Sequence, residues 1–459
     1  MRILFLIVVT VSGIIASFYN AFYGLLLYTF YSFAHPLMLV GWTSFETYRP
    51  SLIVAIVVIA TTIMQNKKII IKHKLTFLCI LFLGQCYLSL LIRGEDMSYS
   101  SSYFIGLLSR TLLITFITSS LIEDFSKLKM YMMASAVFLG LLGAYYGFFG
   151  LLAGATSIVG NLSGDNNAYS TWLNMSLPVI YYVGMALRDK RWRTIAKIIF
   201  AGNVLAVLLT FSRAGSLTLC VILVILTLHK MRKILLFIII PIGVIALFFL
   251  APNSSTQYGE RWEGNETAVK QVGVAGSKAE NVKEAYKARM ETLRQPLGEI
   301  DSGKSRIHFW VTAIHMANAN PIFGVGFQRY MDEYNNYDNT YGFFGGARAL
   351  HNTILQTLAE MGYVGFLLFA AIIVNFFLTI EASKRRVKRC MEEDQEKKEF
   401  TAYLNALSIS MVAFIINSSF VNCLYFETLW AFIGVAIAVD NITKKFDQQE
   451  IVLQADTNG

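Results

Sequence analysis

Polar and ionisable side chains gather in a few short clusters of an otherwise apolar chain. The sharpest cluster is ALHNTILQTLAEMGYVGF, in which Arg348 precedes His351 by three residues and Asn352 follows it directly. A histidine can accept a proton near neutral pH and so act as a base, but it can also cap a helix as a neutral polar group. The residue types leave both roles open for His351.

Two further arginines lie where new helices are expected to begin. Arg213, in TFSRAGSL, falls between two apolar runs, and a helix start combined with an arginine is suited to bind an anion. The alternative is an arginine that extends to lipid headgroups. Arg306 opens a second expected helix, and its alternative role is a surface salt bridge with Asp301.

The remaining polar residues have structural and functional interpretations. Asp165, Asn166 and Asn167, in GNLSGDNNAYS, either cap a helix or line a polar substrate groove. Glu360 follows His351 by nine residues, which in one continuous helix puts it about 13 Å deeper and half a turn away. We therefore expect Glu360 to form a structural hydrogen bond or ion pair.

Composition sets the class of protein that must position these residues. The 459 residues are 55% hydrophobic and only 15% charged, with a mean hydropathy of +0.52. A soluble protein carries roughly a quarter charged residues, so this composition predicts a polytopic membrane protein built from α-helices. The net charge of +9 lies mostly in short loops, which favours membrane orientation over nucleic-acid binding.

Apolar segments define about thirteen candidate helices. They are expected at residues 3–18, 20–39, 51–65, 75–93, 103–121, 130–153, 168–187, 195–211, 214–229, 233–251, 353–380, 402–419 and 423–440. If the first two form one broken element, the chain makes about twelve crossings instead. The first segment is expected to be an uncleaved helix, and the topology of the N-terminal part stays open.

Basic loops set the expected orientation. The loops at 66–74, 188–193, 229–233 and 384–389 are rich in Lys and Arg, so we expect them on the cytoplasmic side. The expected organisation is N-terminal transmembrane helices over 1–251, a large outer loop over 252–350, C-terminal transmembrane helices over 351–443 and a cytoplasmic tail over 444–459.

The large loop is expected to contain helices of its own. A polar helix is predicted over 278–295 and a second over 305–321, with Ile307, Trp310, Ile314 and Ala317 packing on the bundle. A tight turn at GVGF (324–327) should use the positive φ available to glycine. No disulfide framework or zinc site is expected from the five cysteines, and no carboxylate accompanies the histidines at metal-ligand spacing.

The motifs SRIHFWVTAIHMANANPIFGVGFQRY and ALHNTILQTLAEMGYVGF resemble the signature of the O-antigen ligase and O-antigen polymerase superfamily. GDNNAYSTWLNMSLP and TFSRAGSL resemble its upstream motifs, so the resemblance spans roughly residues 155–440. The N-terminal stretch YGLLLYTFYSFAHPLMLVGW is similar to the O-glycosylation ligases that accompany exosortase systems.

The resemblance implies a GT-C-like, metal-independent, inverting glycosyltransferase of the bacterial inner membrane, needing no cofactor. The donor would be a glycan linked to polyprenyl diphosphate, and the acceptor would be a hydroxyl group on a glycan, a lipid or a protein. Membrane lipids would surround the protein. The resemblance assigns diphosphate binding to Arg213 and Arg306, with Arg348 as a possible helper, and the base to His351. Asp165, Asn166, Asn167 and Asn352 would line the groove. A polysaccharide polymerase with the same site, and a transporter of lipid-linked glycans, are the alternatives.

Overall fold

The fold consists of α-helices throughout the part of the chain that the structure describes. The computed structural model describes residues 2–34, 50–67, 70, 72–93, 109–152, 166–228, 302–340, 348–392 and 394–457. These ranges hold fourteen helices and no strand, which confirms the predicted all-α bundle. The helices are α1 (Arg2–Tyr19), α2 (Ala21–Ala34), α4 (Pro50–Met64), α5 (Lys74–Arg93), α7 (Ser109–Leu121), α8 (Phe125–Leu152), α9 (Asn166–Ala186), α10 (Lys190–Leu209), α11 (Arg213–Leu228), α14 (Ser302–Ala319), α15 (Tyr330–Tyr337), α16 (Thr353–Cys390), α17 (Gln395–Ser418) and α18 (Glu427–Thr457).

Most of the expected apolar segments coincide with these helices. The segment 233–251 and the polar helix expected over 278–295 lie outside the described residues. The sequence did not predict α15, because its eight residues YMDEYNNY are short and mostly polar, although Tyr330, Tyr334 and Tyr337 recur at helical spacing. It also stopped α16 ten residues early, because the basic stretch 384–389 was expected to be a loop and instead continues the helix.

Five helices are long and apolar enough to cross a membrane, which supports a multi-pass membrane protein. They are α5, α8, α10, α16 and α17. Four shorter apolar helices, α1, α2, α4 and α11, accompany them. Many apolar side chains on these helices are exposed, as expected for surfaces that contact lipid.

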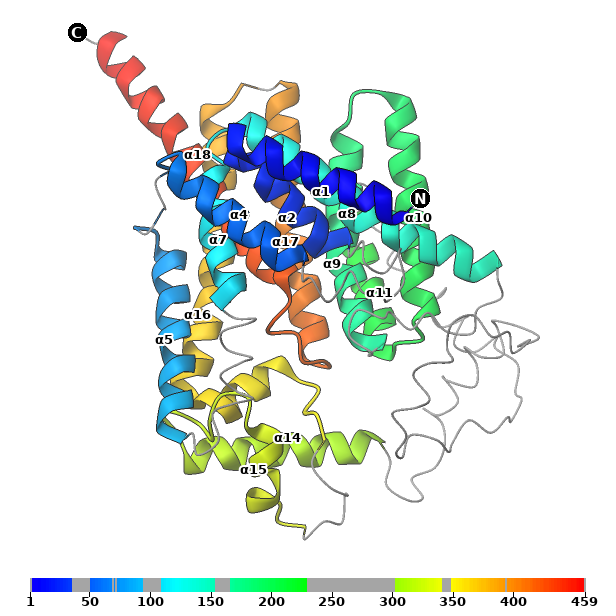
Figure 1. Ribbon diagram of the computed structural model, residues 1–459, viewed down its shortest axis with the longest axis vertical. Helices are drawn as coiled ribbons and strands as arrows, with labels where there is room; N and C mark the ends of the chain where they lie inside the picture. Colours follow the sequence, from blue (N-terminus) through cyan, green and yellow to red (C-terminus); the bar gives the residue numbers. More distant parts are fainter. Residues whose placement is uncertain are drawn as a thin grey trace.

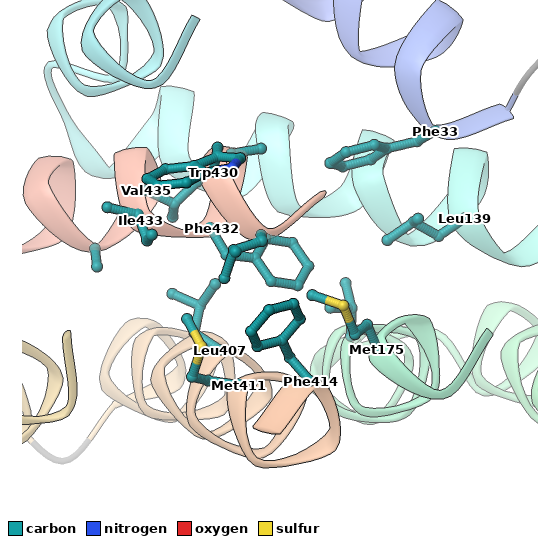
Figure 2. Close-up of a cluster of buried hydrophobic side chains, with 14 of the residues drawn as sticks. Phe33, Leu139, Met175, Leu407, Met411, Phe414, Trp430, Phe432, Ile433 and Val435 are labelled. Carbon is teal, nitrogen blue, oxygen red and sulfur yellow. The ribbon is translucent and has the colours of Figure 1, made fainter. Parts of the chain in front are cut away.

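The helices enclose one large apolar core. Figure 2 shows part of it: Phe33 of α2, Leu139 of α8, Met175 of α9, Phe414 of α17 and Phe432 of α18 meet in the middle of the bundle. Helix α17 packs along α9, and α18 packs along α7 and α16. Ser410 Oγ donates to the Met175 carbonyl oxygen at 2.7 Å and thereby fixes the antiparallel register of α9 and α17.

The first two helices form a hairpin. Helix α1 ends at Tyr19, α2 begins at Ala21, and Thr10 hydrogen-bonds the Tyr31 hydroxyl, so the chain folds back on itself between them. The Gln65 side chain accepts from the Ala21 amide and donates to the Ser17 carbonyl oxygen. The first two segments are therefore separate helices and not one broken element, while the number of crossings stays a prediction.

The described parts of three basic stretches, 66–74, 188–193 and 384–389, gather at one end of the bundle, while the loop at 229–233 lies outside the described residues. Lys67 pairs with Glu123 at 2.7 Å, and Asp440 contacts both His73 Nε2 and Arg386 Nη1. The Gln395 side chain also donates to the Ala186 carbonyl oxygen, which brings the α9–α10 turn to the same end. We call this the basic end. In Figure 1 it is the end from which α18 projects, and α14 and α15 lie across the opposite end.

Ion pairs at the basic end determine the ionisation of its carboxylates. Partial burial acts to raise the pKa of Glu123, but hydrogen bonds from Lys127 and Lys67 outweigh it and hold that pKa below its ordinary value. Glu123 thus stays charged and joins the loop after α4 to the start of α8. An anionic Glu123 offsets part of the excess of Lys and Arg here.

Helix α14 packs through a face that agrees only in part with the predicted one: Trp310 and Ala317 pack as expected, whereas Ile307 and Ile314 do not. Phe309, Ala313 and Met316 are buried, together with Ala317. Ile307 and Ile314 are exposed, by 59% and 39%. The spacing of the apolar residues was correct for a helix, but both faces of α14 are partly apolar, so periodicity alone identified only half of the residues that pack.

Helix α16 is sharply kinked and not one continuous helix. Gly362 adopts φ 68° and ψ −172°, which interrupts the helical backbone. The first part, Thr353–Met361, lies along α14, and the remainder runs beside α5 (Figure 1). Both His351 and Glu360 precede this kink, so the depth and facing predicted for Glu360 stay predictions.

The turn at 321–326 holds the kink in place through the backbone. Val325 N donates to the Ala359 carbonyl oxygen at 2.9 Å, Gly326 N donates to that of Glu360, and Tyr363 N donates to that of Pro321. Gly324 and Gly326 have φ of 66° and 115°, which confirms the predicted glycine turn. The two motifs that carry the family resemblance therefore form one packed unit.

Helix α5 completes this unit from the other side. Ser89 Oγ lies 2.7 Å from the carbonyl oxygens of both Phe323 and Glu360, and Gln85 Nε2 donates to those of Ile322 and Met361. The Glu360 carboxylate accepts from Gln356 Nε2 at 3.1 Å. The structural hydrogen bond expected of Glu360 is confirmed.

We predict that Gly324→Ala destabilises the protein by about 1–3 kcal/mol from backbone strain, with a further cost from steric overlap. A Cβ at Gly324 would lie 2.3 Å from the Glu360 carbonyl carbon. The matched control is Gly84→Ala on α5, where a Cβ would meet no atom within 4 Å. The measurement is the apparent melting temperature of purified protein in detergent, and equal melting of both variants would contradict the packed kink.

Candidate active site

The starts of α9 and α11 are held together by a small hydrogen-bond network. Ser212 Oγ donates to Asn167 Oδ1 at 2.7 Å and accepts from Gly215 N at 3.0 Å, as an N-cap does. Ser170 Oγ donates to Ser212 Oγ, and Asn174 Nδ2 donates to the Gly215 carbonyl oxygen. The two helix starts therefore form a rigid pair.

Arg213 is fixed by this network at the first position of α11. It is half-buried, and the residues on either side, Ser212 and Ala214, are buried. The preceding Phe211 has φ +50°, which turns the chain sharply into α11. The cation thus lies beside the amide groups of a helix N-terminus, an arrangement that favours anion binding.

Asn166 and Asn167 stand at the first turn of α9 and have different partners. Asn167 is bound to Ser212, whereas Asn166 Oδ1 is buried and has no hydrogen-bond partner among the described residues. Asp165 lies outside the described residues. Asn166 is therefore the amide of this cluster that best fits a groove-lining role, because a buried polar atom requires a partner.

The start of α16 positions His351. Asn352 is buried and acts as the N-cap, its Oδ1 accepting from Leu355 N at 3.0 Å. Asn352 N donates to Asn422 Oδ1, and Thr353 Oγ1 donates to the Val421 carbonyl oxygen at 2.7 Å. His351 is half-exposed and has φ +50°, a backbone conformation that this capped turn imposes.

Asn352 and Arg348 lie at the start of α16 in different surroundings. The side-chain oxygen of Asn352 is used as a helix cap, so it supports the backbone that carries His351. Arg348 is exposed, three residues before His351. Neither observation tests their proposed part in binding a substrate.

Helix α14 brings Arg306 towards the segment that carries His351. Arg306 is half-buried on the first turns of α14. One helical turn later, Trp310 Nε1 donates to the Leu350 carbonyl oxygen at 3.3 Å. Because Leu350 directly precedes His351, this contact places the arginine and the histidine on neighbouring segments.

Helix α17 joins the two halves of this candidate site. At the basic end, Gln395 contacts Ala186, and further along, Ser410 contacts Met175. Continuing this antiparallel register brings the last turn of α17 to the start of α9. The loop after α17 carries Asn422, which binds Asn352. Arg213, Asn167 and His351 therefore lie at the end of the bundle opposite the basic end.

A cluster that the sequence did not predict ties α15 to α14. His308 Nε2 lies 3.0 Å from the Tyr334 hydroxyl and 3.0 Å from Asp338 Oδ1. Burial, reinforced by the Asp338 charge, raises the pKa of Tyr334 to about 12, so Tyr334 remains a phenol. A histidine two residues after Arg306 was visible in the sequence, but its partners lie some thirty residues away.

The described residues contain no group of three His, Cys, Asp or Glu side chains that could hold a metal ion. His308 is bound as above, and His315 Nδ1 lies 3.2 Å from the Asn339 side-chain nitrogen. These two histidines thus have separate partners within α14, α15 and the turn that follows. The described part of the site thus contains arginine side chains and asparagine amides that a ligand could contact.

Comparison with known proteins supports the O-antigen ligase and polymerase superfamily, as the motifs predicted. Residues 198–370 match the family model described as O-Antigen ligase. This range contains Arg213, Arg306, Arg348, His351 and the kink of α16. It begins after the first helices of the bundle, so Asn166 and Asn167 fall outside it.

One curated relative is the exopolysaccharide production protein ExoQ of Rhizobium meliloti (strain 1021). It is 24% identical to this chain over 123 residues, which cover 26% of this chain. The matched part spans about a quarter of that relative's own length, 27%. The likeness is thus a distant one that covers a single segment.

We predict that Ser212→Ala destabilises the protein by about 1 kcal/mol, because it removes the N-cap of α11 and the link to Asn167. The matched control is Ser216→Ala, one turn later on the same helix, where Oγ has no hydrogen-bond partner among the described residues. Unfolding of purified protein in mixed micelles measures both. An equal loss of stability in Ser216→Ala would argue against the hydrogen-bond network at the starts of α9 and α11.

Proposed function

We propose that this protein is an O-antigen ligase-like membrane glycosyltransferase. It moves a glycan from a polyprenyl diphosphate carrier to an acceptor hydroxyl on a glycan, lipid or protein. The observation that carries the proposal is the position of the ionisable residues: the range matching the O-antigen ligase family contains Arg213, Arg306 and His351, on segments connected at one end of the bundle.

The diphosphate is the group that the arginines would bind. When the bond between the sugar carbon and the phosphate oxygen breaks, negative charge develops on the leaving diphosphate. Arg213 and Arg306 stabilise that charge, since a guanidinium can bind two phosphate oxygens at once. Arg213 also has the amide groups of the α11 start beside it. Fixed cations of this kind let the reaction proceed without a metal ion.

His351 is the proposed base. It takes the proton from the acceptor hydroxyl as the acceptor oxygen attacks the sugar carbon opposite the leaving diphosphate, which inverts the configuration at that carbon. The N-cap at Asn352 and the contact with Asn422 hold the backbone of His351 in place. Asp165, Asn166 and Asn167 are proposed to line the groove, and Arg348 to assist in binding the diphosphate.

Orientation follows from the distribution of positive charge. Lys and Arg accumulate in cytoplasmic loops of membrane proteins, so the basic end is assigned to the cytoplasm of the bacterial inner membrane. The site would then face the outer side, with residues 252–350 as the outer loop between the transmembrane parts 1–251 and 351–443. The tail at 444–459 would be cytoplasmic.

A polysaccharide polymerase is the second candidate. The relative named as an exopolysaccharide production protein favours it. The same cations and base would serve, but the acceptor would be another lipid-linked repeat unit. A transporter of lipid-linked glycans is the less favoured alternative, because it has no need of a base at His351.

We predict that Arg213→Ala, Arg306→Ala and His351→Ala each reduce glycan transfer by at least about 100-fold, since each removes a group that acts in the transition state. The Arg213→Lys variant should fail as well, because an ammonium group does not bind two oxygens in a fixed plane. The assay uses purified protein, a defined polyprenyl-diphosphate glycan and candidate acceptors. His315→Ala, an exposed histidine on α14, is the matched control and should remain active.

The same assay distinguishes the reaction classes. Transfer should persist in EDTA if fixed arginines replace a metal ion. One glycan added to each non-carrier acceptor indicates a ligase, and a ladder built on the lipid carrier indicates a polymerase. Wild-type transfer by His351→Ala would refute the proposed base.

A further inference from the structure

The basic end contains a cationic cavity that the proposed reaction does not use. It has a volume of 380 Å³ and lies between the last turn of α9, the start of α10 and the start of α17. Three cations, Arg188, Arg193 and Lys398, line it, and no carboxylate does. Figure 1 shows these helix ends far from α14 and α15.

Two acids close to the cavity have partners of their own. Glu399 accepts from Lys129 Nζ at 2.6 Å and from Gln395. Asp189 caps α10 by accepting from Arg191 N at 2.7 Å and keeps its charge. Since three cations and no carboxylate line the cavity itself, its lining has an excess of positive charge, which favours an anionic ligand.

Arg193 is the residue best placed to bind such a ligand. One of its terminal nitrogens donates to the Arg188 carbonyl oxygen at 2.8 Å, which fixes the side chain. Its Nε is buried and has no hydrogen-bond acceptor among the described residues. A buried donor without an acceptor is costly, so an oxygen atom of a ligand would stabilise this arrangement.

An apolar surface continues from the cavity along the sides of the helices. A second cavity of about 270 Å³ shares Ala186, Leu187 and Arg188 with the first. Apolar residues, among them Met133 and Trp192, line it together with Asp189 and the paired Lys129 and Glu399. Trp192 is 60% exposed, and Ile195 and Ile198 follow it on α10 with 42% and 53% exposure. A tryptophan at the end of such a helix is typical of the boundary between lipid and water.

We propose that this cavity binds a phosphate-bearing anion, and that its source is the headgroup of an anionic phospholipid. Arg193, Arg188 and Lys398 bind the phosphate oxygens, and the acyl chains lie over Met133 and the exposed face of α10. Basic cavities between helix ends at the membrane surface suit this class of ligand. The proposal depends neither on glycan transfer nor on which leaflet the basic end faces.

The test uses nanodiscs of phosphatidylcholine that contain increasing fractions of phosphatidylglycerol with brominated acyl chains. Bromine near Trp192 quenches its fluorescence, and subtracting the signal of a Trp192→Phe variant isolates that residue. We expect saturable quenching in the wild type. It should need about five times more phosphatidylglycerol in Arg193→Gln, since one phosphate-binding cation contributes about that factor.

Arg191→Gln is the matched control, because Arg191 is exposed on the same helix and lines neither cavity. An equal shift in this control would overturn the proposal in favour of general surface attraction. If Arg193→Gln does not fold, Lys398→Gln and Arg188→Gln replace it. Loss of the quenching when excess inorganic phosphate is added would support the phosphate site but assign it to a soluble anion. Absence of saturable quenching in the wild type would overturn the site altogether.

Discussion

The structure depends on how the backbone groups freed at the α16 kink are satisfied. When a helix breaks at Gly362, the carbonyl oxygens of the preceding turn lose their helical partners, and buried carbonyl oxygens without partners are costly. The turn at 321–326 supplies amides and α5 supplies Ser89 and Gln85. These replacement hydrogen bonds join α5, the turn at 321–326 and α16, which are distant in sequence.

The kink also allows α16 to contribute to both the candidate site and the bundle. The part of α16 before Gly362 stays with α14 and the candidate site, whereas the part after it enters the bundle beside α5. Glu360 lies two residues before the kink and is buried. Gln356 Nε2 donates to its carboxylate at 3.1 Å, and Ser89 Oγ and Gly326 N donate to its backbone carbonyl oxygen.

The two ends of the bundle use positive charge differently. At the basic end several cations pair with acids, as Arg386, Lys444 and His73 do with Asp440, whereas the cavity near Arg193 is lined by three cations and no carboxylate. At the opposite end, Arg213 stands at the start of α11 beside the hydroxyl of Ser212 and the amides of the helix N-terminus. Such an arrangement is suited to an anion, and a diphosphate is the anion proposed for it.

Sequence by itself determined the class of fold, nearly all of the apolar helices and the glycine turn at 324–326. Long apolar runs and glycines in tight turns are local signals, since one segment suffices to produce them. It also selected Arg213, Arg306 and His351 as the residues to consider, although the family resemblance was needed to assign their roles.

Only the tertiary structure decided the kink at Gly362, the buried face of α14, the helix α15 and the pairing of His308 with Tyr334 and Asp338. Each of these depends on partners far away in the chain: the kink is stable because other segments satisfy its carbonyl oxygens, and both faces of α14 are partly apolar until the bundle covers one. Periodicity within one segment contains no information about such partners. For that physical reason the positions along the chain were predictable and the connections between them were not.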